Sequence, residues 1–156
     1  VKFSNTKMAL PYEFSLNYST LQPLNGTYCR VNLTTDLRRS KVKQGENIRL
    51  DVAVKNVTSE GLPSAIALIG IPAGMSTLPK QLKKLSEESA FDFYEILPTG
   101  HIALYFRGMA PGEVINIPLE LTADLKGDYE SPASVAYLYY ENDKQFWSKP
   151  GRVSVE

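Results

Sequence analysis

The segment from Asn47 to Lys55 alternates apolar and polar residues at nearly every position. Ile48, Leu50, Val52 and Val54 share one face of an extended chain, whereas charged residues lie on the other face. A period of two residues is that of a β-strand with one side in a core, and it differs from the 3.6-residue period of a helix. The segment therefore predicts a sheet that is buried on one side.

Other segments show the same strand-like composition, with turns rich in glycine and proline between most of them. Strands are predicted at 31–34, 65–71, 91–97, 102–107, 114–122 and 135–141. The segment 65–71 is apolar on both faces, which predicts a central strand. Pro118 lacks an amide hydrogen, which predicts an edge position for the strand around it.

One stretch departs from the period of two. Leu78, Leu82 and Leu85 are spaced four and three residues apart, and Pro79 suits a first helical turn. A short amphipathic helix is predicted over 78–88, with its leucines packed on the sheets. Its polar face carries three lysines: Lys80, Lys83 and Lys84. This lysine face has two interpretations, an ordinary solvated surface or a docking surface for an acidic partner.

Seven or eight short strands and one helix in a connection predict an all-β fold, an immunoglobulin-like antiparallel β-sandwich. A length of 156 residues fits one domain, which we place at residues 11–156. Residues 1–10 are less patterned and are predicted to be a linker or the end of a preceding domain. The start, without Met or signal peptide, indicates a piece of a longer chain.

The charged residues balance, with 17 basic and 17 acidic side chains, so the net charge predicts no nucleic-acid partner. Cys29 is the only cysteine and His101 the only histidine. A nucleophile–base pair would need both, and zinc sites use several such ligands. We therefore predict a buried inert thiol, a histidine at the surface or at a strand edge, no catalytic residue, no metal and no cofactor. The chain is not expected to be an enzyme.

The aromatic residues near the C-terminus have two interpretations. They are Tyr137, Tyr139, Tyr140, Phe146 and Trp147. In a sandwich most of them are expected to form an aromatic layer in the core. The alternative is a stacking platform for sugars, as in a carbohydrate-binding or adhesion module of a cell-surface protein.

Four Asn-x-Ser/Thr triplets could accept glycans in a secreted eukaryotic protein: Asn17, Asn25, Asn32 and Asn56. The sequence leaves their modification open.

Several stretches, taken in order, resemble the C-terminal receptor-binding-type domain of α-macroglobulins, and are most similar to bacterial members. They are Leu50–Asn56, the apolar run Ala65–Gly74 with its proline-glycine end, the helix Pro79–Leu85, Phe93–Ile96, and the tyrosine-rich Ala136–Asp143. The start at Leu10–Phe14 is similar to the chain's exit from the domain before it.

The resemblance implies a part of a secreted or surface-anchored protease trap, hence an extracytoplasmic location. It implies packing against neighbouring domains of the same chain, proteases captured by the whole protein, and any membrane anchor in other parts of the chain. The family's thioester motif Cys-x-Glu-Gln is absent, because Cys29 precedes Arg30-Val31-Asn32. Animal members present two helix lysines four residues apart; Lys83 matches the second, but Pro79 occupies the first.

Overall fold

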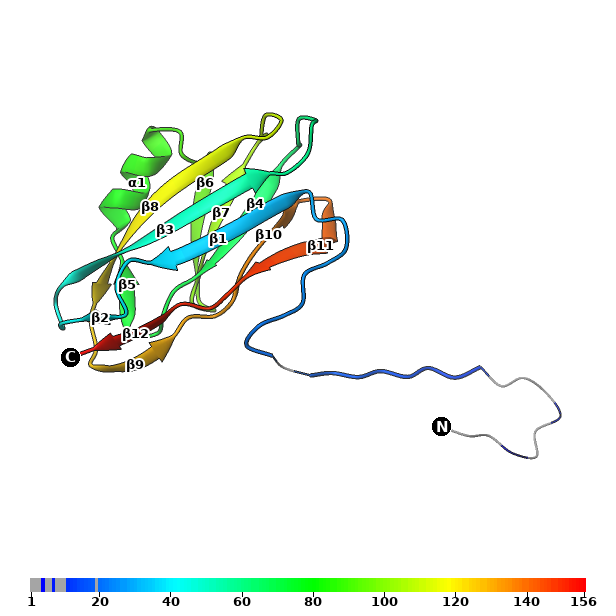
Figure 1. Cartoon of the computed structure of the whole chain (residues 1–156), viewed down its shortest axis with the longest axis horizontal. Coiled ribbons are helices and arrows are strands. Elements are labelled where there is room, and N and C mark those ends of the chain that lie inside the picture. The colour runs from blue at the N-terminus through cyan, green and yellow to red at the C-terminus, as the bar shows by residue number, and fades with distance from the viewer. Residues whose placement is uncertain (1–3, 5–6, 8–10, 19) are drawn as a thin grey trace.

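The protein is a sandwich of two β-sheets, closed at one end by a third small sheet (Figure 1). The computed structural model describes residues 4, 7, 11–18 and 20–156. Neighbouring strands in the sheets run antiparallel, with one parallel pair between β2 and β12. The predicted fold class, an all-β sandwich with one short helix, is confirmed.

The order of the strands across each sheet differs from their order along the chain. Across the first sheet the strands are β1 (Val31–Leu37), β3 (Asn47–Asn56), β8 (Val114–Ala123) and β5 (Met75–Thr77). Across the second they are β11 (Glu141–Ser148), β10 (Ser134–Leu138), β4 (Ala65–Gly70), β7 (His101–Phe106) and β6 (Phe93–Leu97). Across the third they are β2 (Lys41–Val42), β12 (Arg152–Val155) and β9 (Gly127–Glu130).

Strand β3 shows how the alternating sequence builds the core. Ile48, Leu50, Val52 and Val54 are all buried, and their strand pairs with β1 on one side and β8 on the other. These side chains join one cluster with the inward residues of β4 and β7 in the opposite sheet. Burial of each large apolar side chain contributes about 1.5–3 kcal/mol, so the alternation specifies which face turns inward.

The apolar strand β4 is central, as its sequence predicts, because it lies between β10 and β7. Pro118 lies in β8, which has neighbours on both sides of the sheet. However, β5 pairs only with residues 121–123 of β8, so the stretch at Pro118 is locally an edge. The edge position predicted for Pro118 is therefore confirmed locally, though β8 as a whole is not an edge strand.

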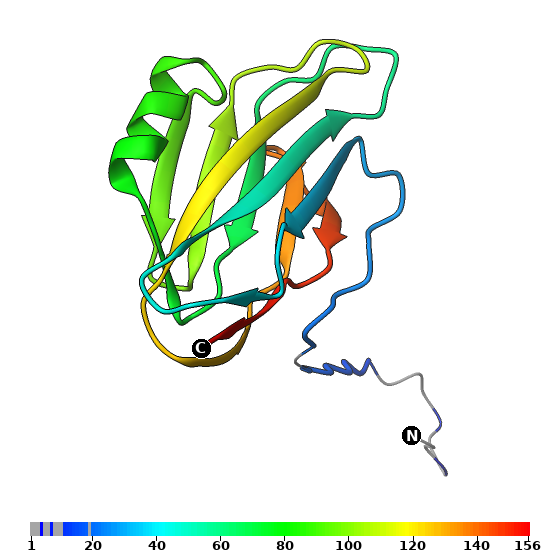
Figure 2. The same ribbon diagram turned by 60° about the vertical axis from the view of Figure 1, so that its left-hand side comes forward.

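Helix α1 (Pro79–Glu87) starts with proline in its first turn and lies beside β8 and β6 (Figure 2). Leu82 and Leu85 are buried against the sandwich, as their spacing predicts. No helix among the described residues has the length and apolar character required to cross a membrane.

The hairpin between β10 and β11 differs from the sequence-based prediction. Leu138 pairs with Glu141, so the turn is formed by Tyr139 and Tyr140, and the polar residues after Glu141 belong to β11. Both turn tyrosines are exposed, so the expectation of a largely buried aromatic layer was wrong. Tyrosine favours strands, but a two-residue turn places its side chains outside both sheets.

Residues 11–18 are extended and lie outside the sheets, and the first strand begins at Val31 (Figure 1). Between them, Gly26 donates its N–H to Gln145 O at 2.8 Å, which ties the chain to the open edge of β11. The predicted boundary after residue 10 falls mainly on residues outside the described part of the chain, and stays a prediction.

Candidate functional site

The lysine face of α1 is exposed to solvent. Lys83 and Lys84 lie 3.8 Å and 3.6 Å from Glu87 and Glu88, each one turn along the helix. Exposed pairs of this kind contribute about 0.3–0.5 kcal/mol, because water screens them. Lys80 is exposed at the start of the helix. The structure thus brings the three predicted lysines onto one accessible surface, where two of them are paired with carboxylates.

A second surface is an aromatic groove of about 320 Å³ between the β10–β11 turn and strands β6 and β7. Six of the residues along it are Asp92, Phe93, Tyr105, Arg107, Tyr139 and Tyr140. The Phe93 and Tyr105 rings lie 5.7 Å apart, and the Tyr139 and Tyr140 rings lie 5.0 Å apart. Tyr140 is 85% exposed, so this groove presents apolar ring area to solvent.

Polar groups at the edge of the aromatic groove are held in defined positions. Tyr105 donates its hydroxyl to Glu95 at 3.0 Å, and the backbone N–H of Arg107 donates to Asp92 at 2.7 Å. Desolvation, followed by the bond to the Glu95 carboxylate, raises the pKa of Tyr105 above its ordinary value of 10.0. Burial likewise raises the pKa of Tyr137 above 10.0. Both phenols therefore stay neutral hydrogen-bonding groups at physiological pH.

The aromatic residues singled out in the sequence do not form one platform. Trp147 pairs with Val135 near the end of the β10–β11 ladder that lies away from the turn, whereas Tyr139 and Tyr140 form the turn. Phe146 is the next residue along β11 and packs against the core from one sheet face. The groove instead recruits Phe93 and Tyr105 from β6 and β7, which sequence analysis missed. The sequence did contain one signal for this groove. The predicted strand 91–97 has aromatic residues near its start, and the predicted strand 102–107 has them near its end.

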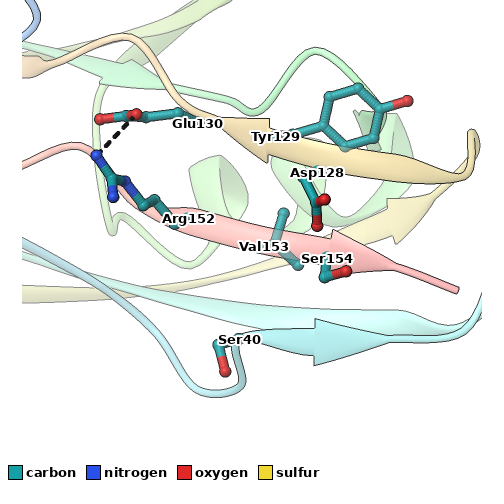
Figure 3. Close-up of a pocket in the computed structure, with 7 residues that line it drawn as sticks. All are labelled: Ser40, Asp128, Tyr129, Glu130, Arg152, Val153 and Ser154. Carbon is teal, nitrogen blue, oxygen red and sulfur yellow. Dashed lines mark ion pairs between the residues drawn. The ribbon is translucent and has the colours of Figure 1, made fainter.

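A shallow hollow of about 370 Å³ lies on the small sheet at the closed end of the sandwich (Figure 3). Glu130 and Arg152 form an ion pair across it at 3.2 Å. Successive residues of β9 alternate, so Tyr129 and Asp128 point to opposite sides of the strand (Figure 3). Asp128 and the hydroxyls of Ser40 and Ser154 also line the hollow. The hollow therefore offers hydrogen-bonding groups, one ion pair and a further carboxylate to a contacting surface.

Cys29 and His101 occupy separate places. The Cys29 thiol lies 3.2 Å from both Gly26 O and Gln145 O beside β11, and it is half-buried, not fully buried as predicted. His101 starts β7, where its Nδ1 lies 3.1 Å from Thr99 O and its Nε2 lies 3.3 Å from Ala133 O. Each side chain is therefore engaged with backbone carbonyls. Among residues 11–18 and 20–156, no three His, Cys, Asp or Glu side chains gather in a way that could hold a metal ion.

Asn56, one of the four candidate glycan acceptors, is fully buried at the end of β3. Its Nδ2 donates to Glu60 O at 2.7 Å and to Ala110 O at 2.8 Å. Its Oδ1 accepts the backbone N–H of Thr58 and the Thr58 hydroxyl, both at 2.8 Å. The side chain joins two loops and is not accessible for modification in the folded protein.

Comparison with solved structures adds a fold-level relationship. Salmonella α2-macroglobulin matches with a TM-score of 0.67 and 13% sequence identity, over 86% of this chain and 10% of that one. An Escherichia coli α2-macroglobulin structure spanning domain MG7 to the C-terminus matches with a TM-score of 0.67 and 12% identity, over 86% of this chain and 24% of that one. The fold is shared with bacterial α2-macroglobulins. The chain spans about a tenth of the length of the intact proteins that it matches.

A further similar fold is the CARDB domain of a Pyrococcus furiosus protein, solved in complex with di-metal ions. It matches with a TM-score of 0.52 and 14% identity, over 90% of this chain and all of that domain. No protein-family model matches the sequence, and no curated protein matches it. The macroglobulin resemblance in the sequence thus agrees with the fold comparison, which places the likeness within a region ending at the C-terminus.

Proposed function

We propose that this chain is the C-terminal interaction and packing domain of a macroglobulin-like protein that traps proteases. The observation that carries the proposal is the shared fold over 86% of the chain, at a tenth of the length of the similar proteins. Two of those structures are described as Escherichia coli α2-macroglobulin activated by trypsin or by porcine elastase. Protease capture in our proposal is an activity of the whole protein, in an extracytoplasmic location.

The domain's own contribution is contact with neighbouring domains, without catalysis and without nucleic acid. Its surface supports such a role through the lysine face, the aromatic groove and the polar hollow on the small sheet. Any membrane anchor lies in other parts of the polypeptide. The macroglobulin thioester would also lie elsewhere, because Cys29 is followed by Arg30 and not by the motif's residues.

The test uses the full-length polypeptide from which this domain comes. It is incubated with trypsin, and the remaining trypsin activity is measured on a large protein substrate and on a small chromogenic one. A trap hinders the large substrate and leaves the small one accessible, so selective loss of protein digestion is expected. Loss of neither activity, or of both equally, would overturn the proposal, as would a gene that encodes no further domain.

For the lysine face, we propose a docking surface for an acidic surface of a neighbouring domain. The exposed positions of Lys80, Lys83 and Lys84 support it. Changing all three to Glu in the full-length protein should weaken that contact and accelerate limited proteolysis between domains. A matched control changes three exposed lysines elsewhere, Lys43, Lys126 and Lys149, to Glu. Equal proteolysis of both triple variants would exclude this role.

A second candidate function is carbohydrate binding, which the aromatic groove favours. Exposed rings of Phe93, Tyr139 and Tyr140 stand beside hydrogen-bonding groups, an arrangement typical of a ligand groove. A glycan array probed with the domain is expected to give binding that Tyr140→Ala abolishes. Tyr28→Ala is the control, because Tyr28 is equally exposed but lies outside the groove. An array without a signal would exclude this function.

A further inference from the structure

Strand β6 is an outermost strand of the second sheet, at the opposite side from β11 (Figure 1). Among its five residues only Glu95 is charged. Two of its large apolar residues, Phe93 and Ile96, are each 56% exposed. Apolar edge strands pair readily with other chains, and proteins usually protect them with charges, prolines or covering loops. With one charge and no proline, β6 lacks two of these protective features.

The other edge strand of the same sheet is protected in two ways. β11 is mostly polar and contains three charged residues. The chain before β1 also bonds to its outer side, where Gly26 N–H donates to Gln145 O at 2.8 Å and Trp147 N–H donates to Asn25 Oδ1 at 2.7 Å. Helix α1 lies beside β6, but none of the described residues of this helix makes a hydrogen bond with β6. The free edge of β6 is thus the less protected of the two.

Pairing with β7 determines which way the side chains of β6 point. Ile96 lies opposite Ile102, which is fully buried in the core. Residues that lie opposite each other in a ladder point to the same face, so Ile96 faces the space between the two sheets. Tyr94, two residues earlier, faces the same way and packs against the core. Ile96 is therefore an inward-facing residue that is nevertheless more than half exposed.

An apolar hollow of about 390 Å³ lies next to Ile96, between the β5–α1 connection and the β6–β7 hairpin. Its apolar lining includes Ile71, Met75, Pro79, Ile96, Leu97 and Ile102. Three of these residues belong to the core cluster, so the hollow opens onto the core of the sandwich. When a strand is added to a sheet edge, main-chain hydrogen bonds give affinity and pockets for alternate side chains give specificity. The free edge and the adjoining hollow provide both requirements.

The outer face of the same edge carries a negative charge. Glu95 accepts the Tyr105 hydroxyl at 3.0 Å, and it forms no ion pair with any residue that the structure describes. By contrast, Asp92 just before the strand is paired with Arg107 at 3.9 Å. A basic residue opposite Glu95 in an added strand would form a cross-strand pair of opposite charges, which is favourable. Charge complementarity therefore selects a segment with a basic residue at this position.

We propose that the free edge of β6 receives an extended basic segment of a partner protein as an additional strand. The segment has a lysine or arginine opposite Glu95 and an apolar residue on each side of it. These two neighbours point inward, because successive residues of a strand alternate faces, and the one opposite Ile96 enters the hollow. A second copy of the chain fits less well, since two β6 strands paired symmetrically about Glu95 would bring two carboxylates together. The inference goes beyond protease trapping and does not depend on it.

The probe for this site is a synthetic peptide of about seven residues, a typical strand length, with a central lysine between two valines and threonine elsewhere. Its binding to the 156-residue chain is measured by isothermal titration calorimetry. Glu95→Lys should weaken binding about tenfold, and a peptide with glutamate in place of the lysine should restore it. Asp143→Lys, an exposed charge reversal on the other edge strand, is the matched control and should leave binding of the lysine peptide unchanged.

Two further measurements test the hollow and the strand pairing. A peptide with both valines replaced by serine should bind at least about tenfold more weakly, because the hollow then receives no apolar side chain. Hydrogen exchange, measured by mass spectrometry, should be fast at amides on the free side of β6 in the free protein. Saturation with the lysine peptide should slow these amides, because a paired strand is protected from solvent.

Several results would overturn the inference. Absence of binding at about millimolar peptide would show that no strand is added to this edge. Equal effects of Glu95→Lys and Asp143→Lys would show that the peptide responds only to overall charge, and equal binding of the valine and serine peptides would exclude the hollow. Slow exchange of β6 in the free protein would show that the edge is already covered, by a second copy if sedimentation detects a dimer and by α1 if it detects a monomer.

Discussion

Gln81 of α1 bridges the open edge of β8 on both sides of Leu119. Its Nε2 donates to Pro118 O at 3.0 Å, and its Oε1 accepts the backbone N–H of Glu120 at 2.9 Å. Pro118 has no N–H of its own, so the edge that faces the helix needs only these two bonds at this point. One amide side chain therefore substitutes for a neighbouring strand and holds α1 against the sheet.

Replacement of Gln81 by Ala should lower the free energy of unfolding by about 1–2 kcal/mol, because a backbone donor and acceptor lose their partner. Urea titration followed by circular dichroism measures the change. Glu87→Ala on the exposed face of the same helix is the control and should change stability by less than about 0.5 kcal/mol. Equal effects of the two substitutions would show that Gln81 does not anchor the helix.

Asn56→Ala should be more costly, by about 2–4 kcal/mol, since it removes all the hydrogen bonds of a fully buried side chain to Thr58, Glu60 and Ala110. Thermal unfolding monitored by calorimetry is the appropriate measurement. Asn116→Ala, at an exposed position of β8, provides the control for loss of an asparagine in a strand. A melting temperature within about 1–2 °C of the unmodified protein would contradict the role of Asn56 as a buried junction.

Gly70 lies where the chain at Pro132 passes closely. A Cβ at Gly70 would stand 2.0 Å from Pro132 O, so Gly70→Ala forces the backbone at Gly70 and the backbone at Pro132 to move apart. We expect a loss of about 3 kcal/mol in the free energy of unfolding, at the upper end of overpacking effects. Gly61→Ala is the control, because its Cβ would meet its nearest neighbour at 3.8 Å. Equal stability of the two variants would show that the Pro132 segment moves without cost.

Ionisation of Asp51 should make the free energy of unfolding depend on pH in the acid range. Desolvation raises its pKa, but hydrogen bonds from Arg49 and Arg38 outweigh this and hold the pKa below its ordinary value of 3.8. A carboxyl whose folded pKa is depressed contributes stability above pH 3.8, and the contribution is lost as pH falls through the folded pKa.

The melting temperature of the unmodified protein should therefore fall more than that of Asp51→Asn between pH 7 and acid conditions below pH 3.8. Asp124→Asn, at an exposed site just after β8, should behave like the unmodified protein. Parallel acid curves for the unmodified protein and Asp51→Asn would rule out this contribution.

The strands and helix could be predicted from the sequence because their periods are local. Three local patterns indicate which side of an element is buried: the alternation in β3, the two apolar faces of β4 and the leucine spacing of α1. Short strands such as β5 and β12 were missed, since three or four residues hold too little pattern. The lysine face was predicted because a helix places its exposed residues by the same local geometry.

The aromatic groove depended on the tertiary structure. Phe93 and Tyr105 come together because β6 and β7 pair in one register, and Tyr139 and Tyr140 reach them from a separate hairpin. The alternation of a strand does not specify which strand pairs with it, or which residue of that strand lies opposite each of its own residues.

The sequence by itself determined an alternating β-protein with one amphipathic helix that carries an exposed lysine face. Only the tertiary structure decided that Asn56 is a buried junction, that Gln81 closes an edge, and that residues 11–18 lie outside the sheets. The physical reason is that the local alternation of a strand specifies which of its faces is buried. Which strand or loop it contacts depends on interactions between residues far apart in the chain.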